Sequence, residues 1–238
     1  EVKKGQRQRQ SPLPFTTSTL QQEASRQLGF TAQRTMRVAQ ELYEGLSLGS
    51  LGHVGLITYM RTDSTRVAQE AMEAAEKEIL RRFGGAYVRL RQGGRGAQDA
   101  HEAIRPTHVD LDPDAIKEYL TRDQYRLYRL IYLRFLASQM TPARYDTMTV
   151  TLEAGETGHL FRASGSRLVF PGFLALYQEG KEEDERDEDE VSLPALEEGQ
   201  MAELLDFYPE QHFTQPPPRY TEASLIKALE EKGIGRPS

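Results

Sequence analysis

The spacing of apolar residues changes near Thr141-Pro142, and this change limits the folds open to the chain. Before this point, apolar side chains recur at intervals of three and four, as in Leu127 and Ile131, which is the period of a helix. Beyond it, residues 145–152 alternate between the two faces of a strand, and residues 159–177 are also strand-like. The sequence therefore predicts a multidomain α+β fold, with a mainly helical first part and a β-rich second part.

Start and stop signals divide the chain into elements. Thr19 and Gln22 have the spacing of a capping box, and Gly29 can end the helix that they begin. The apolar residues at 55–61 predict a short strand, and Thr62-Asp63-Ser64 can cap the helix predicted after it. The other predicted elements are helices at residues 31–43 and 65–83, a helix start at Asp112-Pro113, a helix from the Thr121 and Gln124 box to Thr141, a strand at 201–207, and a helix from 221 to 232 after the prolines at 216–218.

The composition excludes several classes of protein. The chain has no cysteine, so a disulfide scaffold, a thiolate metal site and a cysteine nucleophile are all excluded. No apolar run approaches the ~20 residues that a membrane-spanning helix needs. The first ten residues lack the apolar core of a signal peptide. We therefore expect a cytoplasmic protein with no membrane partner.

The charge is unevenly distributed along the chain. Residues 1–142 carry 21 Lys and Arg against 16 Asp and Glu, whereas residues 143–238 carry 9 against 20. The run at residues 181–190 contributes eight of those acidic side chains. The first part, with its balance of +5, is compatible with a polyanionic partner but does not require one.

Tyr59 and Arg61 form the first candidate site. They lie two residues apart in the predicted strand, so their side chains would share one face. A tyrosine oxygen is a poor nucleophile at its ordinary pKa of ~10, and a fixed cation nearby stabilises the phenolate. A guanidinium can also hold two oxygens of a phosphate. The pair therefore suits attack on a phosphodiester with a covalent phosphotyrosine, although an amphipathic tyrosine beside a surface arginine is the plainer alternative.

His101 and Asp63 are weaker candidates. A histidine can donate to a phosphate or carry a proton near neutral pH, but a loop histidine bonded to a backbone carbonyl would look the same in the sequence. Asp63 could orient His101, or it could simply cap the helix that follows.

Four blocks of this sequence resemble blocks of the type IA DNA topoisomerases, in the same order. They are residues 14–24 (PFTTSTLQQEA), 56–64 (LITYMRTDS), 100–107 (AHEAIRPT) and 233–238 (GIGRPS). Met60 between the tyrosine and the arginine, together with the long first block, is more similar to the bacterial topoisomerase I branch than to topoisomerase III, which usually has proline there. A topoisomerase III-like paralogue is the alternative within the family.

The resemblance implies a role for each candidate residue. Tyr59 would attack a DNA phosphodiester and leave a 5′-phosphotyrosyl link, which allows strand passage and religation without ATP. Arg61 would hold the scissile phosphate. His101, held by Asp63, would contact DNA near the cleavage point, and Arg236 would bind a phosphate of the single strand. The implied partner is single-stranded or negatively supercoiled DNA, and the implied location is the nucleoid.

The resemblance also implies a domain layout. Residues 1–11 would end a β-rich gate domain, and residues 12–142 would be the mainly α domain with the catalytic tyrosine. The gate domain would resume at 143–214, so that the helical domain is inserted into it. Residues 215–238 would begin the helical domain that binds the single strand.

Members of the family also have a Toprim domain, with a catalytic Glu, a Lys and acidic ligands for Mg²⁺, that has no counterpart among these residues. We therefore expect an internal piece of the enzyme that binds no metal itself, needs its own Toprim domain as partner and is inactive alone. A non-catalytic DNA-binding or scaffolding module with the same fold is the alternative.

Overall fold

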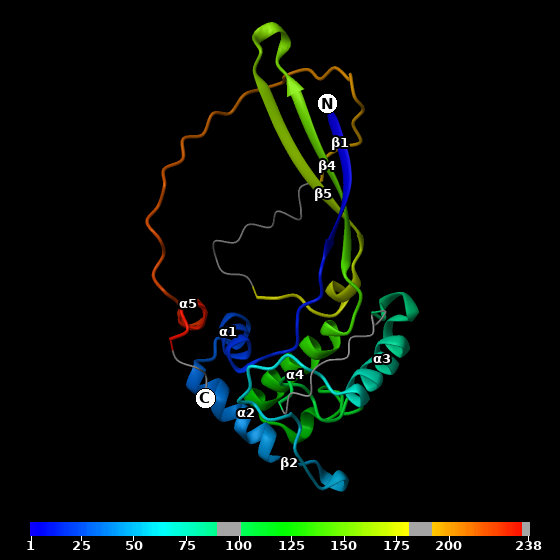
Figure 1. The fold of residues 1–238 in the computed structure, drawn as a ribbon, viewed down its shortest axis with the longest axis vertical. Helices are drawn as coiled ribbons and strands as arrows, with labels where there is room; N and C mark the ends of the chain where they lie inside the picture. The colour runs from blue at the N-terminus through cyan, green and yellow to red at the C-terminus, as the bar shows by residue number, and fades with distance from the viewer. Residues whose placement is uncertain (90–100, 181–191, 235–238) are drawn as a thin grey trace. The chain divides into compact units, whose positions relative to one another are not determined.

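The computed structural model describes residues 1–89, 101–180 and 192–234 (Figure 1). The chain divides into two compact units. The sheet unit contains Glu1–Arg9, Arg144–Phe170 and Arg186–Arg219. The helical unit contains Gln10–Ala143, Pro171–Glu185 and Tyr220–Ser238.

The sheet unit is built on three strands in the order β1-β4-β5. They are β1 (Val2–Arg9), β4 (Ala143–Glu153) and β5 (Leu160–Phe170). The last two form an antiparallel hairpin in which Thr149 faces Ser164. β1 runs antiparallel to β4, because Glu1 is bonded to Thr151 while Gln6 is bonded to Asp146. The alternation in residues 145–152 thus predicted the central strand of this sheet.

The helical unit contains five α-helices and one small hairpin in its described residues. The helices are α1 (Thr17–Leu28), α2 (Ala32–Glu44), α3 (Gln69–Phe83), α4 (Arg122–Ser138) and α5 (Glu222–Glu231), and the hairpin pairs β2 (Leu46–Ser47) with β3 (His53–Val54). Short 3₁₀ turns occupy Gly49–Leu51, Gly85–Tyr87, Lys117–Tyr119 and Gly172–Ala175 here, and Gly155–Thr157 in the sheet unit.

Helix α4 supplies much of the core of the helical unit. Its apolar side chains Leu127, Ile131 and Phe135 are completely buried, as the helical spacing predicted. The helix begins with the predicted capping box, in which Thr121 and Gln124 bond to each other's backbone N–H groups. Burying leucine, isoleucine and phenylalanine side chains contributes about 1.5–3 kcal/mol each, so α4 is a stable base for the segments packed on it.

The predicted start of the first helix is wrong by one turn. Thr16, not Thr19, is the N-cap of α1, and Thr19 is the partner residue of the capping box. Gln22 instead bonds to Ser18, one turn before it in the same helix. The predicted helix end is confirmed, because Gly29 has a left-handed backbone with φ of 65°.

Two predictions around Tyr59 are also wrong. Residues 55–61 do not form a strand; within them only Ile57 makes an isolated bridge, to Pro106. The helix predicted from residue 65 begins at Gln69, so Thr62-Asp63-Ser64 does not cap it. The reason is tertiary: the carbonyl of Thr62 accepts a bond from the start of α1, and the segment that follows stays extended to pair with residue 103.

Three further predicted elements differ from the structure: the end of the strand-like stretch at 159–177, the strand at 201–207 and the helix start at Asp112-Pro113. β5 ends at Phe170 and a 3₁₀ turn follows, in which Gly172 has φ of 50° and lies against backbone oxygens of Thr141 and Pro142. Any side chain at Gly172 would collide with those oxygens, since its Cβ would lie 2.4 Å from them. Residues 201–207 form no strand. Asp112-Pro113 begins a turn, not an α-helix.

The compact units and the predicted domains have different limits. Residues 171–180 and helix α5 belong to the helical unit by their contacts, because α5 packs on α1 and the turn after β5 packs on α4. The four-domain layout itself stays a prediction. Among the described residues, none of the helices combines the length and the apolar composition that spanning a bilayer requires.

Candidate active site

The segment from Leu56 to Thr62 alternates between burial and exposure in an irregular way. Leu56, Met60 and Thr62 are buried, whereas Tyr59 is 47% exposed and Arg61 is exposed. The buried side chains anchor the segment in the helical unit, so the phenol and the guanidinium are the groups left facing outward. Both predicted site residues of this block are therefore accessible to a large substrate.

The start of helix α1 holds one end of this segment. The backbone N–H of Thr17 donates to the carbonyl of Thr62 at 2.9 Å. The hydroxyl of Thr17 donates to the carbonyl of Met60 at 2.7 Å and accepts from the N–H of Thr62 at 2.9 Å. The first block of the sequence thus binds directly to the block that carries Tyr59.

The block at residues 103–107 holds the other end. The N–H of Thr58 donates to the carbonyl of Arg105 at 2.9 Å, and the hydroxyl of Thr58 donates to the carbonyl of Ala103 at 2.7 Å. The N–H of Arg105 donates to that same hydroxyl at 3.0 Å. Thr107 adds a bond to the carbonyl of Leu56. Backbone on both sides of Tyr59 is therefore fixed by residues far away in the sequence.

The phenol of Tyr59 has an aromatic neighbour. The ring of Tyr43, near the end of α2, lies edge-on against it with centroids 5.3 Å apart. Such a contact restricts the ring without covering the oxygen. The arrangement offers a phosphodiester an accessible hydroxyl on rigid backbone, with a cationic side chain two residues along the chain.

Asp63 directly follows this segment and His101 precedes the block at residues 103–107, but the two are not joined to each other. Both are exposed, and no hydrogen bond between them is found in the parts of the chain that the structure describes. The carbonyl of His101 accepts a bond from Nε of Arg66 at 3.5 Å. Arg236 lies outside the described residues. The roles of these three residues stay predictions.

Glu102 holds the His101 block together. Its carboxylate binds Arg105 at 2.6 Å and approaches Arg66 at 3.7 Å. The N–H of Ala103 also donates to the carbonyl of Arg66 at 2.8 Å. These contacts fix the backbone next to His101, so its imidazole is presented to solvent from an ordered segment.

The helix before the fourth block packs on the first block. Glu230 of α5 accepts a bond from the hydroxyl of Ser18 at 2.6 Å. Glu222, at the start of α5, accepts one from the N–H of Ala32 at 2.9 Å. In this structure the first three blocks meet directly through hydrogen bonds, and α5, which ends just before the fourth block, docks on the first.

Thr17 and Thr58 lie in the quoted blocks, but sequence reasoning assigned neither of them a separate role. They looked like members of a capping run and of a strand. Each is a threonine, whose hydroxyl often bonds to nearby backbone, so the residue type alone does not mark a role at the site. Only the structure shows that their hydroxyls bond to the backbone on either side of Tyr59.

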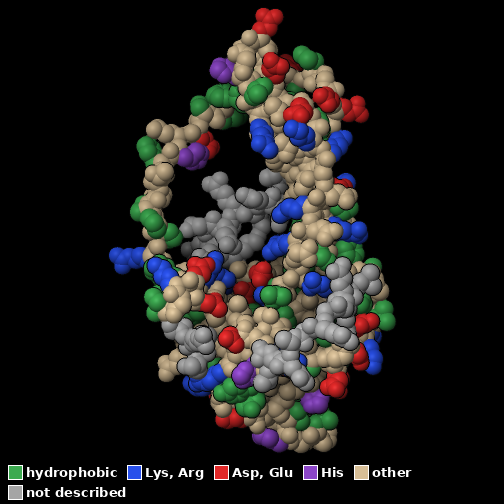
Figure 2. Space-filling model, in the orientation of Figure 1, with side chains coloured by type: hydrophobic (Ala, Val, Ile, Leu, Met, Phe, Trp, Pro, Cys, Tyr) green, Lys and Arg blue, Asp and Glu red, His purple; other side chains and the backbone are tan. Residues whose placement is uncertain are grey.

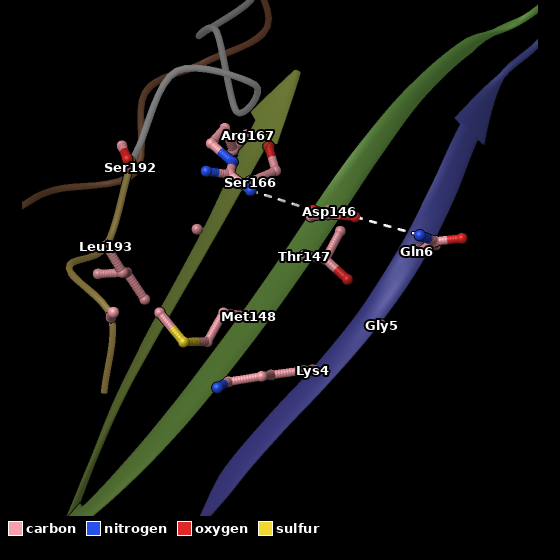
Figure 3. A pocket seen from close by; sticks show the side chains of 12 residues that line it. Lys4, Gly5, Gln6, Asp146, Thr147, Met148, Ser166, Arg167, Ser192 and Leu193 are labelled. Carbon is pink, nitrogen blue, oxygen red and sulfur yellow. Dashed lines mark hydrogen bonds and ion pairs between the residues drawn. The ribbon is translucent and has the colours of Figure 1, made fainter. Parts of the chain in front are cut away.

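The sheet unit has a separate cavity of about 580 Å³ on the face of its strands (Figure 3). Lys4, Met148 and Leu193 line it, with Arg167 and Asp146 joined by an ion pair of 3.3 Å at one end. Lys and Arg side chains gather along these strands in Figure 2, and acidic ones near the hairpin tip. Tyr59 does not line this cavity.

Because the family resemblance implies Mg²⁺, clusters of metal-binding side chains among the described residues bear on the site. In the described part of the chain, no three His, Asp or Glu side chains lie together as possible ligands. These described residues therefore offer no ligand set for Mg²⁺, and whether the chain holds a metal stays a prediction.

Comparison with known proteins agrees with the four blocks. The family model for DNA topoisomerase matches residues 1–238. The structure is similar to full-length topoisomerase I from Thermotoga maritima, with 37% sequence identity over 100% of this chain and a TM-score of 0.76. The chain spans 38% of the length of that protein. The resemblance to the bacterial type IA enzymes is confirmed, and the chain belongs to the DNA topoisomerase family.

Proposed function

We propose that this chain carries the nucleophile of a DNA topoisomerase that cleaves one strand, passes another through the break and reseals it. One observation carries the proposal: the phenol of Tyr59 is exposed on backbone that is bonded on both sides, and the exposed Arg61 follows two residues later. Membership of the DNA topoisomerase family supports DNA as the substrate.

The reaction follows from the chemistry of these two side chains. The oxygen of Tyr59 attacks the phosphorus and loses its proton, the bond from phosphorus to the 3′ oxygen breaks, and a 5′-phosphotyrosyl ester and a free 3′-hydroxyl result. Attack by that hydroxyl reverses the step, so no ATP is consumed. Arg61 stabilises the charge that develops on the phosphate oxygens.

Other groups complete the proposal. His101 contacts DNA near the break with Asp63 beside it, and Arg236 binds a phosphate of the single strand. Single-stranded or negatively supercoiled DNA is the partner, in the cytoplasm at the nucleoid. The β-rich gate at residues 1–11 and 143–214 carries the helical domain at 12–142, and residues 215–238 begin the single-strand-binding domain.

The cleavage step also needs groups that these residues do not supply. We propose that a Toprim domain of the same enzyme provides the acid and the ligands for Mg²⁺, and that Mg²⁺ supplies charge stabilisation at the DNA phosphates. The residues of this chain then bind the strand, orient the phosphate and supply the attacking oxygen. Without that domain the chain is inactive.

Replacing one atom tests the proposal. In the complete polypeptide that carries this sequence, Tyr59→Phe should abolish the covalent adduct with an end-labelled single strand, trapped under denaturing conditions. Removing the hydroxyl keeps the ring, so the free energy of unfolding should change by no more than about 1–1.5 kcal/mol. Tyr119→Phe, at another exposed tyrosine, is the matched control and should leave the adduct yield unchanged. An adduct on the Tyr59→Phe variant at wild-type yield would contradict the proposal.

A further inference from the structure

We infer that Thr17 and Thr58 are positioning residues that fix the backbone of Tyr59 for attack, an inference that rests on the proposed function. Each threonine forms what we call a hydroxyl bridge, in which its Oγ1 bonds to backbone of another block. The Thr17 bridge joins α1 to Met60 and Thr62, and the Thr58 bridge joins Tyr59's neighbour to residues 103 and 105.

Each bridge replaces part of a normal strand pairing. Two paired strands would exchange N–H and carbonyl bonds between their backbones. Here Thr17 donates its N–H to Thr62 but receives the return bond on its hydroxyl. Thr58 likewise donates its N–H to Arg105 and receives the return bond on its hydroxyl. On either side of Tyr59, a threonine hydroxyl thus accepts the hydrogen bond that a backbone carbonyl would accept in a regular strand pair.

The backbone between the two bridges has little else to hold it. No hydrogen bond of the described residues involves the N–H of Tyr59 or of Met60. The burial of Met60 fixes the side chain between Tyr59 and Arg61, but burial has no preferred direction, whereas hydrogen bonds do. The two hydroxyls therefore add to the backbone bonds of Thr17 and Thr58 in setting the direction in which the Tyr59 side chain leaves the backbone.

Burial makes the Thr17 bridge the stronger of the two. Thr17 is 1% exposed, so water cannot reach the site of its hydroxyl. Without that hydroxyl, the carbonyl of Met60 and the N–H of Thr62 would lose a partner that water cannot replace. Thr58 is only half-buried, so water can take over some of its bonds. We therefore expect the larger loss of cleavage rate at Thr17 and the smaller loss of stability at Thr58.

Valine variants separate positioning from folding, because valine has the shape of threonine but no hydroxyl. The experiment measures single-turnover adduct formation on a labelled single-stranded oligonucleotide, the Kd for that strand and the Tm, all in the complete polypeptide. A shift of the nucleophile by 1 Å can cost about a hundredfold in rate. We expect Thr17→Val to form the adduct about ten- to a hundredfold more slowly, and Thr58→Val about tenfold, with Kd within about twofold.

Two further variants control the experiment. Thr17→Ser keeps the hydroxyl and should recover most of the rate. Thr35→Val removes a fully buried hydroxyl that donates to the carbonyl of Thr31, the N-cap of α2, so it should lower the Tm without slowing cleavage. Because Thr58 is half-buried, Thr58→Val should fold and still test the inference if Thr17→Val does not.

The outcomes are distinguishable. The inference is supported if both valine variants are slow at unchanged Kd while Thr17→Ser and Thr35→Val are fast. It is overturned if the valine variants cleave at the wild-type rate while Tyr59→Phe forms no adduct, or if Thr35→Val slows cleavage as much as they do. If Tyr59→Phe forms the adduct normally, the proposed function fails, and the inference fails with it.

Discussion

Tyr43 lies edge-on against Tyr59, with an angle of 66° between the two ring planes. Tyr43 is near the end of α2. The residue before it, Leu42, accepts a hydrogen bond on its carbonyl from the N–H of Leu56 at 2.7 Å. The helix that carries Tyr43 is therefore joined to the segment that carries Tyr59. The contact restricts the phenol from one side and leaves it 47% exposed.

Removing this neighbour should slow cleavage modestly. An edge-to-face aromatic contact is worth about 0.5–1.5 kcal/mol, so Tyr43→Ala should lower the rate of adduct formation by about two- to tenfold. Tyr43→Phe keeps the ring and serves as the control, with an unchanged rate. Single-turnover cleavage of a labelled strand measures both. Equal rates for the alanine and phenylalanine variants would show that the ring does not guide the phenol.

Arg61→Lys should have an intermediate effect on the proposed cleavage. Lysine keeps the positive charge but loses the planar fork that can bind two phosphate oxygens at once. We expect adduct formation to slow by about ten- to a hundredfold in Arg61→Lys and further in Arg61→Ala, because charge-assisted bonds of about 1.5–3 kcal/mol are lost. Arg37→Lys, at an exposed arginine of α2, is the control. A wild-type rate in Arg61→Ala would exclude a role for this guanidinium.

Much of the helical unit could be predicted from its sequence, because its signals are local. The apolar spacing of α4, its capping box at Thr121 and the left-handed Gly29 all act within a few residues, and all three are confirmed. The same holds for the alternation that gives β4. Where the start, the end and the buried face of an element are all set by residues close together in sequence, the sequence predicted that element.

The surroundings of Tyr59 could be predicted only in part. The apolar residues around it suggested a strand, yet the backbone there is bonded through the hydroxyls of Thr17 and Thr58, from partners about 45 residues away in sequence. The late start of α3 has the same origin, since Thr62 is bonded to α1. Such long-range bonds leave no periodic pattern in the sequence, which is why the sequence offered Tyr59 and Arg61 as candidates but did not predict the hydrogen bonds that hold their backbone.

The chain alone should neither relax supercoiled plasmid nor form an adduct, with or without Mg²⁺. The described residues offer no group of three metal ligands, and we propose that the acid and the Mg²⁺ ligands come from the Toprim domain. Agarose gels of plasmid incubated with the chain measure relaxation directly. Adding a separately made Toprim domain of the family should produce a Tyr59-dependent adduct. Relaxation by the chain alone would contradict the proposal that the Toprim domain supplies the acid and the Mg²⁺ ligands. If no adduct forms even with the Toprim domain present, the alternative of a non-catalytic DNA-binding module is favoured.

Glu78 should make stability depend on pH in the acid range. Hydrogen bonds from Arg81, opposed by partial burial and aided by Arg82, lower the pKa of Glu78 from 4.5 to about 2. Because the folded pKa is the lower one, this contribution is fully present above pH ~4.5 and is lost as the pH falls toward 2. Solvent screens this partly exposed cluster, so we expect roughly 1 kcal/mol.

Glu78→Gln tests this pH dependence. Urea denaturation of the variant should show a loss of about 1 kcal/mol at pH 7 that shrinks as the pH falls toward 2, where protonation of the wild-type carboxylate removes the charge. Glu70→Gln, at an exposed position of the same helix, should change the stability by less than about 0.5 kcal/mol at any pH. A difference between wild type and Glu78→Gln that stays constant from pH 7 to pH 2 would rule out the charge as its cause.

Glu23 is the buried charge that ties the segment after β5 to helix α1. It is 3% exposed, and its Oε1 accepts bonds from the hydroxyl of Tyr177 at 3.0 Å, from the N–H of Gly180 at 2.6 Å and from Gln27. Burial raises the pKa of Tyr177 far above its usual range, with a further contribution from the Glu23 charge, so its hydroxyl stays a donor at neutral pH. Nearby, Arg134 bonds to the carbonyl of Leu13 at 2.6 Å.

Glu23→Gln should therefore destabilise the helical unit, although it only replaces one carboxylate oxygen by an NH₂ group. The three donors around Glu23 need an acceptor, and an amide offers a single oxygen and brings two N–H groups of its own. We expect a loss of roughly 1–3 kcal/mol, the cost of leaving buried groups unpaired. Tyr177→Phe should cost less, since it removes one donor and leaves two. Urea denaturation of both variants, with Glu70→Gln as the exposed control, gives the comparison; a Glu23→Gln midpoint equal to that of the control would mean that this carboxylate does not hold residues 177–180 to α1.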